Sequence, residues 1–104
     1  MTDYSKMSDL EINIMVSKSL YGELSNWHKG ELNEGVTDYC NNPSDAWPII
    51  YGELISLSAT ETSEGNHRWF AFSREREGYK QVACGNPLRA AMIVYLMMKE
   101  SENG

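Results

Sequence analysis

Residues 86–98 read NPLRAAMIVYLMM, and this stretch decides the fold expected for the chain. Asn86 is suited to accept hydrogen bonds from the first free amides of a helix. Pro87 fits the first helical position because its missing amide would have no partner there. In the rest of the stretch only Arg89 is strongly polar. A helix that is apolar nearly all round lies at the centre of a domain or in an interface, so we predict such a helix over residues 87–99.

The same Asn-Pro pair opens a second apolar stretch, residues 41–50, which read NNPSDAWPII. Asn42 and Pro43 again form a helix start. Pro48 then falls where an interior amide of a helix would normally bond, so the segment is predicted to re-initiate or kink there. We expect a short helical turn near residues 43–50.

The N-terminal part contains one further helix signal. Ser8 and Glu11 have the spacing of a capping box, apolar residues follow at helical spacing, and Gly22 suits the left-handed position that ends a helix. We predict a helix near residues 9–21. Residues 23–41 have weak periodicity and are interpreted as mostly irregular, with a short strand near residues 36–39 as the alternative.

The middle of the chain alternates between apolar and polar residues. The alternation predicts a hairpin near residues 53–74, with its turn in residues 61–66, and a possible third strand near residues 79–84. The chain is therefore expected to be one α+β domain, residues 1–104, with a small antiparallel sheet packed by helices near residues 9–21 and 87–99.

The chain carries 15 acidic and 9 basic residues among 104, a formal net charge of −6. Residues 1–64 hold 11 acidic and 3 basic side chains (−8), and residues 65–104 hold 4 and 6 (+2). The negative net charge disfavours general nucleic-acid binding. The net positive charge of residues 65–104 still allows a local basic face. The longest apolar run is too short to cross a bilayer, and two distant cysteines without a preceding signal segment favour a cytoplasmic protein.

Four blocks of the sequence resemble the NinX-like family of small proteins from temperate phages and prophages of enteric bacteria. They are Asp3-Tyr4-Ser5, Leu10-Glu11-Ile12-Asn13, residues 40–50 (CNNPSDAWPII) and residues 86–98 (NPLRAAMIVYLMM). The resemblance implies a phage accessory protein, and it carries no reaction, cofactor or catalytic residue over to this chain. Residues 21–39 and 61–83 lie outside the resembling blocks, so no role is transferred to them.

The residues themselves select no catalytic or metal site. Cys40, Cys84, His28 and His67 are all isolated in sequence, whereas structural zinc sites use close ligand pairs. No nucleophile elbow, phosphate loop or His-Glu-x-x-His motif is present. We predict no metal and no cofactor, and we do not expect an enzyme.

Aromatic, methionine and arginine side chains supply the candidate interaction surface. Its members are Trp47, Arg68, Trp69, Arg74, Arg89, Tyr95 and Met98. Within it, residues 67–74 (HRWFAFSR) mix aromatic and basic residues on a predicted strand, as single-strand nucleic-acid platforms do. The competing interpretation, which overall acidity favours, puts Phe70 and Phe72 on the core face of the sheet, with the arginines at its margins.

These observations favour a non-catalytic protein-interaction module. A host or phage protein is the expected partner, and the acidic N-terminal part or the apolar C-terminal helix would provide the surface, the helix also allowing a homodimer. The alternative is a small enzyme or a factor that binds or processes single-stranded nucleic acid. A third hypothesis, an acidic mimic of DNA, rests only on the −8 of residues 1–64.

Overall fold

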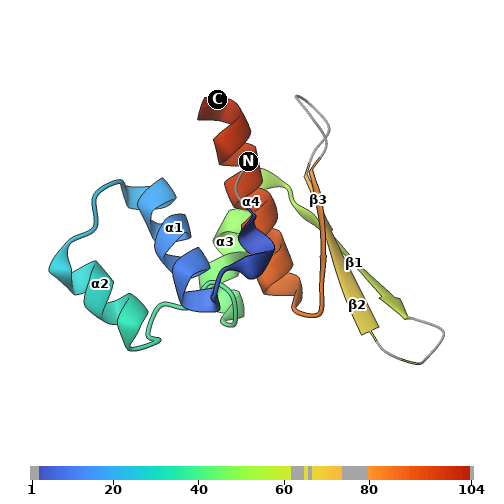
Figure 1. Ribbon diagram of the computed structural model, residues 1–104, viewed down its shortest axis with the longest axis horizontal. Coiled ribbons are helices and arrows are strands. Elements are labelled where there is room, and N and C mark those ends of the chain that lie inside the picture. The colour runs from blue at the N-terminus through green and yellow to red at the C-terminus, as the bar shows by residue number, and fades with distance from the viewer. Residues whose placement is uncertain (1–2, 62–64, 66, 74–79, 104) are drawn as a thin grey trace.

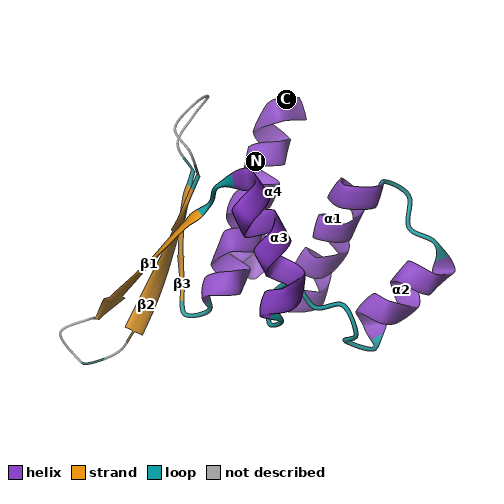
Figure 2. Ribbon diagram, turned by 180° about the vertical axis from the view of Figure 1, so that it is seen from behind, coloured by secondary structure: helices purple, strands orange, loops and turns teal. Residues whose placement is uncertain are grey.

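Helix α4 lies at the centre of the protein, whose computed structural model describes residues 3–61, 65, 67–73 and 80–103. α4 (Pro87–Asn103) lies between helix α1 (Asp9–Tyr21) and the sheet, and it also contacts α3 (Pro43–Glu53). Figures 1 and 2 show this order from opposite sides, with helices on one side of the sheet. The α+β class predicted from the sequence is confirmed.

The burial of α4 explains its composition. Every residue from Ala90 to Leu96 is buried, and Met92 and Val94 are completely so. α1 covers one side of the helix and the three strands cover another, so an apolar face is needed all round. From the sequence, this helix could lie either at the centre of the domain or in an interface. Residues 90–96 lie at the centre.

α1 begins and ends where the sequence predicts. The Glu11 amide donates to Ser8 Oγ at 3.1 Å, and the Ser8 amide donates to Glu11 Oε1 at 3.1 Å, which completes the capping box. Gly22, with φ of 77°, ends the helix in a conformation that a side chain would strain. A short 3-10 turn, η1 (Tyr4–Lys6), precedes α1.

The interpretation of residues 23–41 as mostly irregular is wrong in part, because they contain helix α2 (Asn26–Asn33). Ser25 caps it by accepting the amide of His28 at 3.2 Å. α2 has one buried residue, Leu32, and packs on α1. A short helix with so few apolar residues is stabilised by this tertiary packing and has little periodicity to detect. No strand forms at residues 36–39.

Helix α3 is longer than the turn predicted at residues 43–50, ending at Glu53. The Ser44 amide donates to Asn42 Oδ1 at 3.0 Å, as expected of an Asn-Pro start. The helix continues through Pro48, whose missing amide deprives only the Ser44 carbonyl of a partner. Both residues are exposed, so water can reach that carbonyl.

The sheet has three antiparallel strands in the order β1 (Ser56–Glu61), β2 (His67–Phe72) and β3 (Gln81–Cys84). The predicted hairpin and third strand are confirmed. The predicted turn between β1 and β2 falls largely on residues 62–64 and 66, which lie outside the described residues.

The two faces of the sheet differ in what they contact. Leu57, Ala71 and Val82 are register partners, and all three belong to the core that packs on α4. Successive side chains of a strand point to opposite faces, so Phe70 and Phe72 lie on the outer face. Both are half-buried. The interpretation that Phe70 and Phe72 form the core face is therefore wrong.

Candidate functional site

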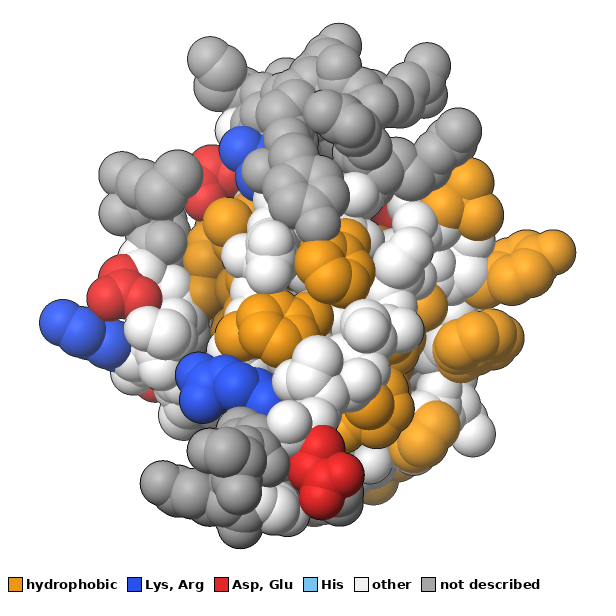
Figure 3. All heavy atoms as spheres, turned by 90° about the vertical axis from the view of Figure 1, so that its right-hand side faces the viewer, with side chains coloured by type: hydrophobic (Ala, Val, Ile, Leu, Met, Phe, Trp, Pro, Cys, Tyr) orange, Lys and Arg blue, Asp and Glu red, His pale blue; other side chains and the backbone are white. Residues whose placement is uncertain are grey.

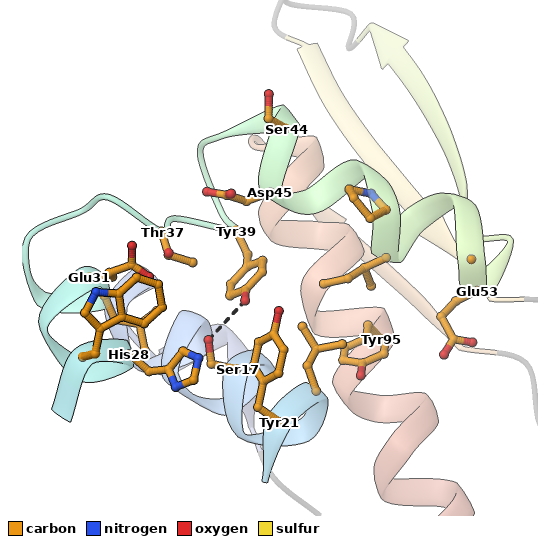
Figure 4. A pocket seen from close by; sticks show the side chains of 16 residues that line it. Ser17, Tyr21, His28, Glu31, Thr37, Tyr39, Ser44, Asp45, Glu53 and Tyr95 are labelled. Atoms are coloured by element: carbon orange, nitrogen blue, oxygen red, sulfur yellow. Dashed lines mark hydrogen bonds between the residues drawn. The ribbon is translucent and has the colours of Figure 1, made fainter. Parts of the chain in front are cut away.

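A groove of about 620 Å³ opens between α1, α2 and α3, at the end of the molecule away from the sheet (Figure 4). α2 forms one wall and α3 the other. Tyr95 of α4 lies on the floor. Its volume is in the range of ligand-binding clefts in proteins.

Aromatic rings line much of this groove. Tyr21 stacks on His28 with ring centroids 5.2 Å apart, and Trp27 meets His28 edge-on at 5.4 Å. Tyr39 and Tyr95 add two more rings. Trp27 is 69% exposed, so it forms an open rim of the groove.

Hydrogen bonds between α1 and its neighbours fix the floor. Ser17 Oγ donates to the Tyr39 hydroxyl at 3.2 Å (Figure 4), and the hydroxyls of Ser19 and Tyr95 lie 3.0 Å apart. Burial raises the pKa of Tyr39, with a smaller opposing effect from the Ser17 hydrogen bond. The Tyr39 phenol therefore stays neutral at physiological pH.

Apart from His28, the ionisable groups of the lining other than tyrosine are all acidic. They are Glu31, Asp45 and Glu53, with no lysine or arginine in the lining. Glu53 is paired with Lys99 at 2.9 Å, whereas Asp45 accepts only the Asp38 amide, at 2.9 Å, and Glu31 has no side-chain partner among the described residues. The groove therefore has the chemistry of a site for a positively charged group, which carboxylates and aromatic faces both attract.

A network of amide side chains holds the loop that connects α2 to α3. Asn13 of α1 donates to Asp38 Oδ1 at 2.8 Å and accepts the Cys40 amide at 3.1 Å. Asn86 donates to the Cys40 carbonyl at 2.7 Å while its Oδ1 accepts the Leu88 amide at 2.9 Å. Asn86 thus caps α4 and links that helix to the loop before α3.

Arg89, a candidate interaction residue, is engaged inside the protein. Its Nη1 lies 2.6 Å from Asp9 Oδ1 and its Nη2 donates to the Met7 carbonyl at 2.6 Å. The side chain is 15% exposed. It joins the start of α4 to the start of α1.

The other predicted surface residues lie in different parts of the molecule. Trp47 is 58% exposed on α3, whereas Tyr95 is buried. Met98 is half-buried and packs against the core. On β2, Arg68 is exposed and Trp69 half-buried. Arg74 lies outside the described residues. Among the described members of the set, only Tyr95 lines the groove.

The residues of the described part of the chain do not indicate a metal site or an activated nucleophile. No group of three or more His, Cys, Asp or Glu residues lies close enough there to hold a metal ion. Ser25 Oγ lies 3.0 Å from His28 Nδ1, but this hydroxyl already accepts the amide that caps α2. Cys40 is completely buried. The Ser25–His28 contact is thus explained by helix capping.

We expect Cys40 to resist alkylation in the native protein. Burial raises the pKa of its thiol from 9.0 to about 12, which lowers the thiolate fraction about a thousandfold at neutral pH. Cys84 is half-buried and serves as the internal control. Mass spectrometry after iodoacetamide treatment should show Cys84 modified first and Cys40 modified only with denaturant. Equal labelling rates in the native protein would contradict this placement of Cys40.

Comparison with known proteins places the chain in a phage family. No helix among the described residues has the length and apolarity needed to cross a membrane. No curated protein and no solved structure matches the chain. Residues 3–99 match the family described as Bacteriophage P22, NinX. That match spans nearly the whole sequence and includes the blocks whose resemblance was noted above, and the chain belongs to this family.

Proposed function

We propose that this phage accessory protein is a non-catalytic interaction module of the host cytoplasm that holds a basic segment of a protein partner in the groove. The observation that carries the proposal is the lining of the groove, which combines aromatic rings with two carboxylates, Glu31 and Asp45, that have no ion-pair partner among the described residues, whereas Lys99 already pairs with the third, Glu53. A lysine or arginine side chain placed there would contact ring faces and carboxylates together.

The surface of α3 beside the groove supports a protein as the occupant. Pro48 lines the groove, and Tyr51 lies one helical turn further on the same side of α3. Tyr51 and Trp47 are 71% and 58% exposed. Exposed tryptophan and tyrosine side chains are typical anchors of protein interfaces. A bound segment would therefore continue from the groove onto this face of α3.

We expect neutralising Glu31 and Asp45, the lining carboxylates without an ion-pair partner among the described residues, to weaken partner binding. Glu31→Gln with Asp45→Asn keeps the shape of the side chains, and asparagine can still accept the Asp38 amide. Loss of two attractive charges from a partly enclosed site should lower the affinity about tenfold or more. Affinity capture from infected cells, read by quantitative mass spectrometry, would compare this variant with the unchanged protein.

The matched control is Glu23→Gln with Glu34→Gln. Both residues are exposed, outside the groove lining, and their replacement changes the net charge by the same amount. A partner lost with the groove variant and kept with the control supports the proposal. A partner lost equally with both variants would mean that only the overall charge matters, and a partner kept with both would exclude the groove.

A further inference from the structure

The outer face of the sheet carries a pair of aromatic rings on its central strand. Phe70 and Phe72 stand side by side on β2 with ring centroids 6.3 Å apart and ring planes 17° from parallel. The helices of the described part of the chain lie on the opposite side of the sheet (Figures 1 and 2). This surface is distinct from the groove, which lies beyond α4 at the other end of the molecule.

Small residues flank the two rings on the neighbouring strands. Ser58 and Ser56 of β1 pair with Phe70 and Phe72, and Ala83 and Gln81 of β3 pair with them on the other side. These four flanking residues are all exposed. The side chains of these four residues are short apart from that of Gln81, so they do not cover the ring of Phe70, and the serines and glutamine offer hydrogen bonds beside it.

The charge of this face differs from that of the chain as a whole. Arg68 lies two residues before Phe70 and shares its face, and it is exposed. Among the described residues whose side chains point to this face, none is Asp or Glu. Figure 3 shows this side of the molecule, with hydrophobic side chains at its centre and both basic and acidic side chains at its margins. In a chain with 15 acidic residues, this is a local surface suited to an anionic ligand.

We propose that the outer face of the sheet binds single-stranded nucleic acid, with Phe70 and Phe72 stacking on bases and Arg68 contacting a phosphate. Adjacent aromatic rings on an open sheet stack successive bases without reading their sequence, while a cation neutralises the backbone. A duplex does not suit this face, because its bases are already stacked on one another. A second copy of the chain would lack the phosphates that the cation matches.

The test is fluorescence anisotropy with labelled oligothymidylate and oligouridylate of about 12 nucleotides at about 50 mM salt, with a duplex of equal length for comparison. We expect both single strands to bind and the duplex to bind more weakly. A preference between the two single strands would show whether DNA or RNA is the ligand. No binding of either single strand, or stronger binding of the duplex, would overturn the proposal.

Three variants locate the binding. Phe70→Ala should weaken binding about tenfold, and Phe70→Tyr, which keeps a ring for stacking, should retain most of it. Arg68→Ala is an exposed change that leaves the fold intact, and it should lower the slope of log affinity against log salt by about 0.7. Unchanged binding with both Phe70→Ala and Arg68→Ala would overturn the proposal.

Two controls separate this surface from the others. Trp47→Ala removes an exposed aromatic residue from α3, and Glu31→Gln with Asp45→Asn alters the groove, so neither should weaken oligonucleotide binding. Sedimentation of the free protein gives the remaining outcome. A dimer that dissociates on Phe70→Ala, with no oligonucleotide bound, would assign the face to self-association and overturn the proposal.

Discussion

Replacing Arg89 by alanine is expected to lower the free energy of unfolding by about 3 kcal/mol, a large part of the stability of a small domain. The guanidinium contacts Asp9 Oδ1 and the Met7 carbonyl, each at 2.6 Å, and the carbonyls of Tyr4 and Ser5, each at 3.4 Å. Alanine would leave these four acceptors without their shared donor, and it would also remove the packing of a side chain that is only 15% exposed.

Urea denaturation followed by circular dichroism measures this effect. Arg89→Lys is the informative control, because it keeps the charge but lacks the planar fork that reaches several oxygens at once, so about half of the loss should remain. If Arg89→Ala cost less than about 0.5 kcal/mol, as surface substitutions do, the residue would not join α1 to α4 as described.

Replacing Met92 by alanine is expected to cost about 3 kcal/mol. Met92 is completely buried at the centre of α4. Alanine in its place leaves a cavity whose walls come from several elements and cannot all move inward.

Met98→Ala is the matched control on the same helix. Met98 is half-buried near the C-terminal end of α4, so its truncation should cost about 1 kcal/mol, and thermal or urea unfolding of both variants gives the comparison. Equal losses, or a larger loss at Met98, would contradict the central place of residues 90–96. This pair also tests the homodimer hypothesis, since a helix buried within one chain has little apolar surface left for a second copy.

The helix starts were predictable because their signals are local. Ser8, Asn42 and Asn86 each cap a helix whose first residues follow directly in the sequence. α2 was missed because its Ser25 cap precedes a segment with a single buried residue. α3 continued through Pro48 because both ends of the missing hydrogen bond lie at the exposed surface, a fact that only the folded chain supplies.

The sheet shows a different limit of sequence reasoning. Alternation correctly groups Phe70 with Phe72, but it does not say which face packs on a helix. Ala71 takes the core face, where it is completely buried and where α4 packs on β2, a fact that only the folded chain supplies. The groove was not predictable either, since its lining comes from four helices and the loop around Tyr39.

The most direct test of the proposed function is site-specific photo-crosslinking in infected cells. A benzophenone amino acid would replace Trp27 on the groove rim, with Val36, exposed on the loop after α2 and outside the groove lining, as the control position. The account predicts that position 27 crosslinks to a lysine- or arginine-rich segment of one protein and that the Glu31→Gln, Asp45→Asn variant loses this product. Crosslinking to the same protein from position 36 alone, or a product at position 27 that survives the loss of both carboxylates, would contradict it.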